Sequence, residues 1–387
     1  MSVKKKAVAA GMDMTTGSLW KKIMLFSVPL MFSQVLQVLF NMADVAVVGK
    51  FSSAEALGAV GSTTILVSLF TGFLIGMGSG VNVIVAQHLG AREKQEVMES
   101  IHTALLLCLL IGGIIMALCL ALAGPMLRLL NTKDDLIAGA ELYFRIYALG
   151  MPALALFNFG NAVLSANGDT TRPLLYLIIA GVLNVILNVF FVIVCGMAED
   201  GVALASIISQ YVSAFLVLLH MIHQKDDCSL HLSKVRLYKG RSKPLLALGI
   251  PAGFQNAIFA IANLFIQRGV NSFESVMVEG NSAASNADTL IYNVMAAFYT
   301  ACSTFMGQNW GAGNRDRMIR SYYVSLAYAF LSGALVGLGL LWFGEGFLYL
   351  FTNDAEVVAA GMLRMRIMCF SYAISAFMDC TIAACRG

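Results

Sequence analysis

The sequence predicts an all-α polytopic membrane protein built from two similar halves. Of its 387 residues, 59% are hydrophobic and only 12% are charged, against about 25% charged in soluble domains. Charge-poor runs of about 20 residues recur along the whole chain, and each is long enough for a helix to cross a bilayer. Short alternating strands, the mark of a membrane barrel, are not found in the sequence.

Ten membrane helices are predicted, at residues 23–48, 57–87, 100–123, 143–165, 174–196, 202–222, 245–267, 283–307, 320–343 and 360–383. The expected domains are a cytoplasmic tail 1–20, an N-lobe 21–224 of six helices, a cytoplasmic linker 225–243 and an incomplete C-lobe 244–387 of four helices. Most of the 25 Lys and Arg residues fall in the tail, the linker and other connections on the same side. The positive-inside rule therefore predicts a cytoplasmic N-terminus, and no removable signal peptide is expected.

The two halves share motifs at an offset of about 221 residues. The matched pairs are Val28-Pro29 with Ile250-Pro251, Gln87–Ala91 with Gln308–Ala312, and Ala166–Gly168 with Cys385–Gly387. A parallel repeat of this kind predicts two lobes related by an axis along the membrane normal, which is transporter architecture. Two helices follow Gly168 in the first half but none follows Gly387, so we expect a six-plus-six protein that lacks about two helices at its C-terminus.

A polar stripe interrupts the first apolar segment. Gln34, Gln37, Asn41 and Asp44 are spaced so that they share one helix face. An ionisable group in a membrane helix faces a partner or a cavity, and by default it indicates function. The alternative is a carboxylate that is hydrogen-bonded for packing alone.

Two asparagine pairs offer partners for Asp44. Asn184 and Asn188, and likewise Asn158 and Asn161, lie on single helix faces. An amide can accept from a protonated carboxyl group and donate to an ionised one, and burial favours the protonated form. This pattern predicts a proton site, although interhelical hydrogen bonds worth about 0.6 kcal/mol each would also explain the asparagines.

Other chemistry is not indicated. The eight cysteines show no paired CxxC spacing and the histidines show no ligand spacing, so no cofactor, metal or disulfide is expected. Sequence signatures of metalloprotease or hydrolase sites are not found, and an enzyme is not expected. A receptor would not be expected to contain such a duplication.

Three features together resemble the multidrug and toxic compound extrusion (MATE) family. They are the proline-bearing first helix with Asp44, the duplicated segments Gln87–Ala91 and Gln308–Ala312, and the segment Asn167–Pro173 (NGDTTRP). The resemblance implies a cation-coupled antiporter that exports amphipathic, often cationic compounds by alternating access. It implies a multi-pass protein of the bacterial inner (plasma) membrane, expected to be a monomer, with protons or sodium and small amphipathic molecules as partners. No nucleic acid partner is expected.

The resemblance also implies a cation site in the N-lobe, at Asp44, Tyr143, Asn158, Asn161, Asn184, Asn188 and Ser206. A common family pattern has an aspartate where Asn188 stands and a threonine where Ser206 stands. The loss of the second acid leaves Asp44 as the lone carboxylate there, which favours proton coupling over sodium coupling, with sodium at Asp44 as the alternative.

A substrate site or second cation site is expected from polar residues in both halves, namely Gln34, Gln37, Asn41, Gln255, Asn256, Asn263, Asp288 and Asp379. Asp288 is expected near a helix end, and structural pairing is the alternative for both acids of the second half. Another function in the same superfamily, a flippase of lipid-linked precursors, would need several basic side chains facing the cavity. Nearly all basic residues are expected in loops, which argues against a flippase.

Overall fold

The structure is a computed structural model, and it describes residues 11–130, 132–270 and 272–387; the side chains of residues 41, 42, 45, 54 and 264 are also outside the description. The elements are α1 (Leu19–Phe51), α2 (Ala54–Ala91), α3 (Lys94–Leu129), α4 (Asp134–Ala148), α5 (Met151–Ala166), α6 (Thr171–Val189), the π-helix η1 (Phe190–Val194), α7 (Glu199–His223), the 3₁₀ helix η2 (Leu232–Lys234), α8 (Ser242–Val270), α9 (Ser275–Gly311), α10 (Arg315–Leu348) and α11 (Ala355–Arg386).

Within the described ranges, eight helices are long and apolar enough to cross a membrane, and the bent pair α4 and α5 would add a ninth. The remaining predicted helix, at 283–307, corresponds to α9, which is 37 residues long but more polar in its first half. The all-α polytopic fold is confirmed.

The helices are longer than the apolar runs that predicted them, because polar residues form their ends. The side chains of Ser53, Asn314 and Asp354 accept hydrogen bonds from backbone N–H groups at the starts of α2, α10 and α11, as helix N-caps do. Hydropathy detects only the apolar middle of a helix. The expected ranges are therefore short by a few residues at most ends.

The predicted helix at 143–165 begins too late. The chain is helical from Asp134, and α4 and α5 meet at a bend of 45°. Pro152 lies in the first turn of α5, where its missing N–H is tolerated. The polar first turn, Asp134 and Asp135, hid the start of α4 from the hydropathy pattern.

Two large cores hold the bundle together. One joins α2, α3, α4, α5 and α7, and the other joins α9, α10 and α11 with the first half of α1. The two cores meet where α2 packs against α9, and α2 also packs along α8, whose first turns belong to the first core. Glycines permit this approach, since a Cβ at Gly76 would lie 2.4 Å from the backbone N of Gly253, and one at Gly80 would lie 2.6 Å from that of Gly249.

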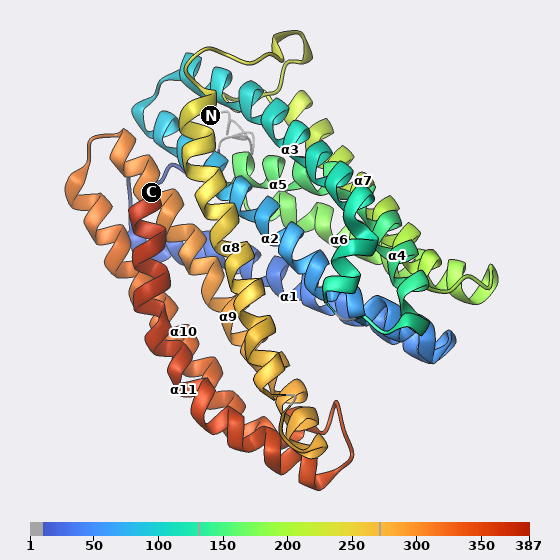
Figure 1. The fold of residues 1–387 in the computed structure, drawn as a ribbon. Coiled ribbons are helices and arrows are strands. Elements are labelled where there is room, and N and C mark those ends of the chain that lie inside the picture. The colour runs from blue at the N-terminus through green and yellow to red at the C-terminus, as the bar shows by residue number, and fades with distance from the viewer. Residues whose placement is uncertain (1–10, 131, 271) are drawn as a thin grey trace, which may run out of the picture.

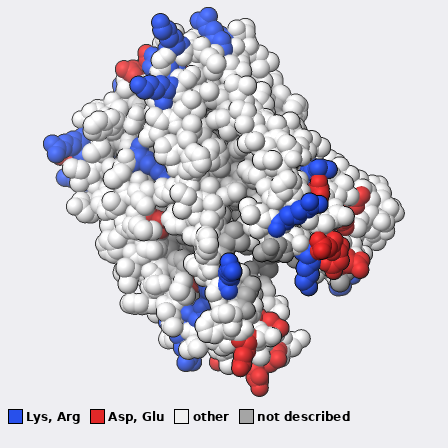
Figure 2. Space-filling view, viewed as in Figure 1, with Lys and Arg blue, Asp and Glu red and all other residues white. Residues whose placement is uncertain are grey.

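Figure 1 shows that the two groups of helices meet beside the labelled C-terminal end and diverge away from it. We call this meeting region the linker end. It comprises residues 11–17, 92–94, 166–170, 225–241, 309–317 and 387, which hydrogen bonds and packing contacts connect. In Figure 2 the acidic side chains gather chiefly at the tips of the two arms, whereas the linker end is mainly basic, and the surface is hollowed between the arms.

Candidate functional site

Asp44 lies in the second half of α1 and faces α6 and α7. Among the described side chains, the Asn188 amide donates to its Oδ1, and the Ser206 hydroxyl donates to its Oδ2 over 3.3 Å. Hydrogen bonds to a charged acceptor are about twice as strong as neutral ones. Both donors therefore stabilise the ionised carboxylate.

Asn188 is the centre of this cluster and is fully buried. Its Nδ2 also donates to Asn184 Oδ1 over 3.2 Å, and Asn184 Nδ2 donates to Ser206 Oγ over 3.4 Å. Asn188 Oδ1 has no hydrogen-bond partner among the described atoms. A buried acceptor left unpaired costs about 1–3 kcal/mol, so this oxygen is available to a protonated carboxyl group or a bound ion.

Tyr143 extends the cluster from α4. Its side chain is 6% exposed, its ring stacks on Tyr147 with centroids 6.0 Å apart, and both phenols lie close enough to Asp44 to interact with its charge. The sequence analysis missed Tyr147, although it lies one helical turn after Tyr143 on the same face. Together, α1, α4, α6 and α7 surround Asp44 with polar groups.

The other predicted N-half residues lie outside these hydrogen bonds. Asn158 is half-buried on α5, where its Nδ2 donates to the backbone oxygen of Leu154 over 2.9 Å. Asn161 is half-buried one turn later, and Gln34 and Gln37 are half-buried along α1. The side chain of Asn41 lies outside the described part of the structure.

In the second half, Asp288 is paired with a basic residue inside the bundle. The Arg364 guanidinium of α11 donates to Asp288 Oδ2 through both Nε, over 3.2 Å, and Nη2, and it also donates to Asn281 Oδ1. One expectation is wrong here. Asp288 lies well inside α9 rather than near its end, because that helix begins at Ser275.

A second basic residue, Arg386, lies near the end of α11 and donates to Gln255 Oε1 of α8. Half-buried Asp379, on the same helix, lies within electrostatic reach of Arg386 and Tyr292. Arg386 is the last residue of α11, although the predicted helix ended at residue 383. It was missed as a site residue, although its spacing from Asp379 on one helix was visible in the sequence.

The remaining two predicted amides differ in their environments. Asn256 is half-buried, and its Nδ2 donates to the backbone oxygen of Gly72 over 3.1 Å, which joins α8 to α2. Asn263 is exposed on α8. The structure therefore groups Asp44 with Asn184, Asn188, Ser206 and Tyr143, and separates them from the polar residues of the second half.

The donor set around Asp44 fits a proton, and it also fits a monovalent cation. Five side-chain oxygen atoms are gathered there, two from Asp44 and one each from Asn184, Asn188 and Ser206. One of them, Asn188 Oδ1, is a buried acceptor that needs a donor or a cation. A single carboxylate among neutral groups can change its charge by taking up one proton.

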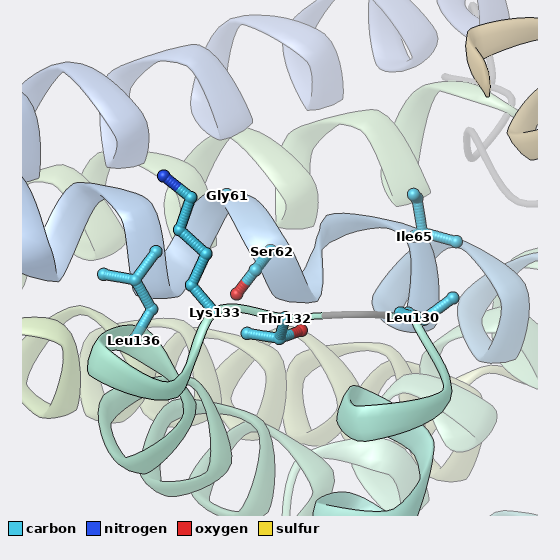
Figure 3. Close-up of a pocket in the computed structure, with 7 residues that line it drawn as sticks. All are labelled: Gly61, Ser62, Ile65, Leu130, Thr132, Lys133 and Leu136. Carbon is cyan, nitrogen blue, oxygen red and sulfur yellow. The ribbon is translucent and has the colours of Figure 1, made fainter. Parts of the chain in front are cut away.

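A separate cavity of about 280 Å³ lies between the first turns of α2 and the connection from α3 to α4. Figure 3 shows that Lys133 and Thr132 border it on the side of this connection and Ser62 on the side of α2. The residues of the predicted sites are not among those that line it. This cavity is therefore distinct from the Asp44 cluster.

The comparisons with known proteins agree on the family. The MatE family model matches residues 29–190 and 251–387. A relative from Bacillus subtilis, named "Probable multidrug resistance protein YpnP", is 31% identical over 361 residues, covering 93% of this chain and 80% of the relative. A more distant relative from Shewanella oneidensis, named "FAD transporter", is 24% identical over 82% of this chain and 71% of its own length.

Solved structures share the fold. One described as the "outward-facing conformation of a multidrug resistance MATE family transporter" superposes with a TM-score of 0.90 at 22% identity, over 96% of this chain and 83% of that chain. Another, a superfamily transporter from Pyrococcus furiosus, gives 0.89 at 22% identity with the same coverage. The extent of the family match, its agreement with the duplicated motifs and the shared fold lead to one conclusion: this chain belongs to the MatE family of multi-pass membrane transporters.

Proposed function

We propose that the protein is a proton-coupled antiporter that exports amphipathic, often cationic drugs by alternating access. It acts as a monomer in the bacterial inner membrane with its N-terminus in the cytoplasm, and its lobes are residues 21–224 and 244–387 joined by the linker 225–243. The observation that supports this proposal most directly is the buried polar cluster around Asp44. The names of the multidrug resistance relatives support the substrate class.

The hydrogen bonds of the cluster suit both protonation states of Asp44. In the ionised state, Asp44 accepts from Asn188 and Ser206. A protonated Asp44 would need an acceptor for its O–H, and the unpaired Asn188 Oδ1 supplies one when the amide turns over. The exchange of donor for acceptor at Asn188 gives Asp44 a hydrogen-bond partner on this side chain in both protonation states.

Proton coupling is favoured over sodium coupling because the cluster contains one carboxylate. The side chain at position 188 is an amide, so Asp44 has no second acid beside it in the hydrogen-bonded group. A single carboxylate attracts a cation with only one negative charge, whereas a proton forms a covalent bond to the carboxylate oxygen. Sodium at the five oxygen atoms of the cluster remains the alternative ion.

A second candidate is an exporter, or a lipid-precursor flippase, whose substrates carry an anionic group. Arg364 and Arg386 place two guanidinium groups inside the second half, and guanidinium recognises carboxylate and phosphate. Arg364 is already paired with Asp288, which leaves Arg386 as the group better suited to such a substrate. The relative named "FAD transporter" agrees with this candidate.

The test is dye-driven proton release from everted vesicles with an acidic interior. The unmutated chain is compared with Asp44→Asn and with Asp135→Asn, which changes an exposed acid in the first turn of α4. We expect a cationic dye to collapse the pH gradient with the unmutated and Asp135→Asn proteins, and exchange to fall at least tenfold with Asp44→Asn.

Dye exchange by Asp44→Asn at the rate of the unmutated protein would overturn the assignment of the site to Asp44. Exchange driven by a sodium gradient alone would replace the proton with sodium at the same site. Exchange of an anionic dye, with no response to the cationic one, would favour the second candidate.

A further inference from the structure

We propose that the duplicated segments Gln87–Ala91 and Gln308–Ala312 form a two-part latch that holds the linker end closed, and that this end opens only when both parts separate. The proposal goes beyond the transport function, because it assigns a role to residues that contact neither the Asp44 cluster nor the polar groups of the second half. The segments lie at the ends of α2 and α9.

The first part of the latch is a pair of reciprocal hydrogen bonds. Gln308 Nε2, in the second half, donates to the backbone oxygen of Ala166 over 2.7 Å. Gln87 Nε2, in the first half, donates to the backbone oxygen of Gly387 over 3.1 Å. Each glutamine therefore reaches the end of a helix in the opposite half, and the repeat that relates the two glutamines also relates the two helix ends.

The second part is a pair of reciprocal backbone contacts. A Cβ at Gly90 would lie 1.9 Å from the backbone oxygen of Gln308, and a Cβ at Gly311 would lie 1.8 Å from that of Gln87. No side chain fits at either position unless the backbone moves. The glycine of each segment thus admits the glutamine of the other, and α2 and α9 touch directly.

This contact is suited to opening and closing because few bonds are lost when it breaks. The accepting backbone oxygens, of Ala166 and Gly387, lie at the end of α5 and just past the end of α11, where backbone oxygens have no partner within the helix. In the closed state the glutamines satisfy them, and in an open state water can do so. Exchange of these two hydrogen bonds for bonds to water limits the cost of breaking this part of the latch, and a small free-energy difference between states is what a reversible switch requires.

The overall arrangement agrees with a latch that is closed. The two groups of helices meet at the linker end and diverge away from it (Figure 1), and the fold superposes on an outward-facing transporter. Gln308 is 6% exposed and Ala86, beside Gln87, is fully buried. Opening of the linker end would expose both residues.

The test measures that exposure without any substrate, so it stands apart from the transport assay. Ala86→Cys is labelled with a hydrophilic maleimide in detergent, and the labelled position is identified by mass spectrometry. Because Ala86 is buried in the closed state, its labelling rate is proportional to the open fraction. A neutral hydrogen bond contributes about 1 kcal/mol, which is about a fivefold change in an equilibrium.

We therefore expect Gln87→Ala and Gln308→Ala each to raise the labelling rate about fivefold, and the double variant to raise it about 25-fold. Gln95→Ala is the matched control, because this glutamine is exposed and, among the described residues, bonds to Glu99 on its own helix. The buried Cys108 and Cys119 serve as internal controls for unfolding.

A second variant tests the closed state directly. A Cβ at residue 307 would lie 3.3 Å from the Ala86 Cβ, close to the separation of a disulfide. Oxidation of Ala86→Cys with Gly307→Cys should form a cross-link quickly, and the double glutamine variant should form it more slowly.

Unchanged labelling at position 86 in the double glutamine variant would overturn the proposal. So would labelling of Cys108 and Cys119 that rises in parallel, since the glutamines would then stabilise the whole fold. Failure of the cross-link to form would also overturn it.

Discussion

Removal of the Arg364 side chain should destabilise the second half strongly, because it would leave a buried carboxylate without its partner. Asp288 is 7% exposed, Arg364 supplies the hydrogen bonds to its Oδ2, and its Oδ1 has no partner among the described atoms. Removal of one member of a buried ion pair costs about 3–5 kcal/mol. We expect Arg364→Ala to fall in this range.

The double variant Asp288→Leu with Arg364→Met shows whether the loss of stability comes from the unpaired charge or from lost packing. Replacement of a buried ion pair by apolar side chains of similar volume is often neutral or stabilising by about 1–4 kcal/mol. We therefore expect the double variant to be close to the unmutated protein, whereas the single variant is not. Arg366→Ala, which removes an exposed arginine two positions along α11, is the matched control.

The assay is thermal unfolding in detergent, followed by the loss of monodisperse protein. Equal stability of the Arg364→Ala and Arg366→Ala proteins would refute the reasoning, and so would a double variant as unstable as Arg364→Ala. The double variant also decides the role of Asp288 in transport. Undiminished dye exchange would make the pair structural, and lost exchange would place it in the substrate or second cation site.

Two further predictions concern the Asp44 cluster and the N-terminal segment. Asn188→Asp adds a second carboxylate beside Asp44, and two negative charges attract a monovalent cation more strongly than one. We therefore expect sodium to stimulate dye exchange by this variant severalfold at fixed pH. Dye exchange that does not respond to sodium would contradict this prediction. Arg317 donates to the backbone oxygens of Met14, Thr16 and Gly17, and hydrogen bonds from a charged donor are worth about 1.5–3 kcal/mol each. Arg317→Gln should therefore speed proteolysis of residues 11–17 about tenfold or more. Arg320→Gln, an exposed change on the next turn of α10, should leave proteolysis unchanged.

The sequence alone predicted the helices, the repeat and the centre of the candidate site. Hydropathy and helical spacing are local properties, and they are enough to place Asp44, Asn184 and Asn188 on polar faces of apolar helices. The structure brought these three side chains into one hydrogen-bonded cluster with Ser206. The assignment of a cation or proton to this cluster stays a prediction.

Helix ends were predicted less well, for a local reason of another kind. The first turns of α4 and α9 contain acids, amides and hydroxyl groups, so the helices predicted from apolar runs begin too late. For α9, this late start placed Asp288 near a helix end.

Only the tertiary structure decided which distant groups meet. The repeat was visible in the sequence, but nothing local shows that Gln87 reaches Gly387 and Gln308 reaches Ala166, or that Arg364 neutralises Asp288. These contacts join residues far apart in the chain, and they depend on how closely the helices approach. That approach is set by glycines whose neighbours cannot be known until the helices are packed together.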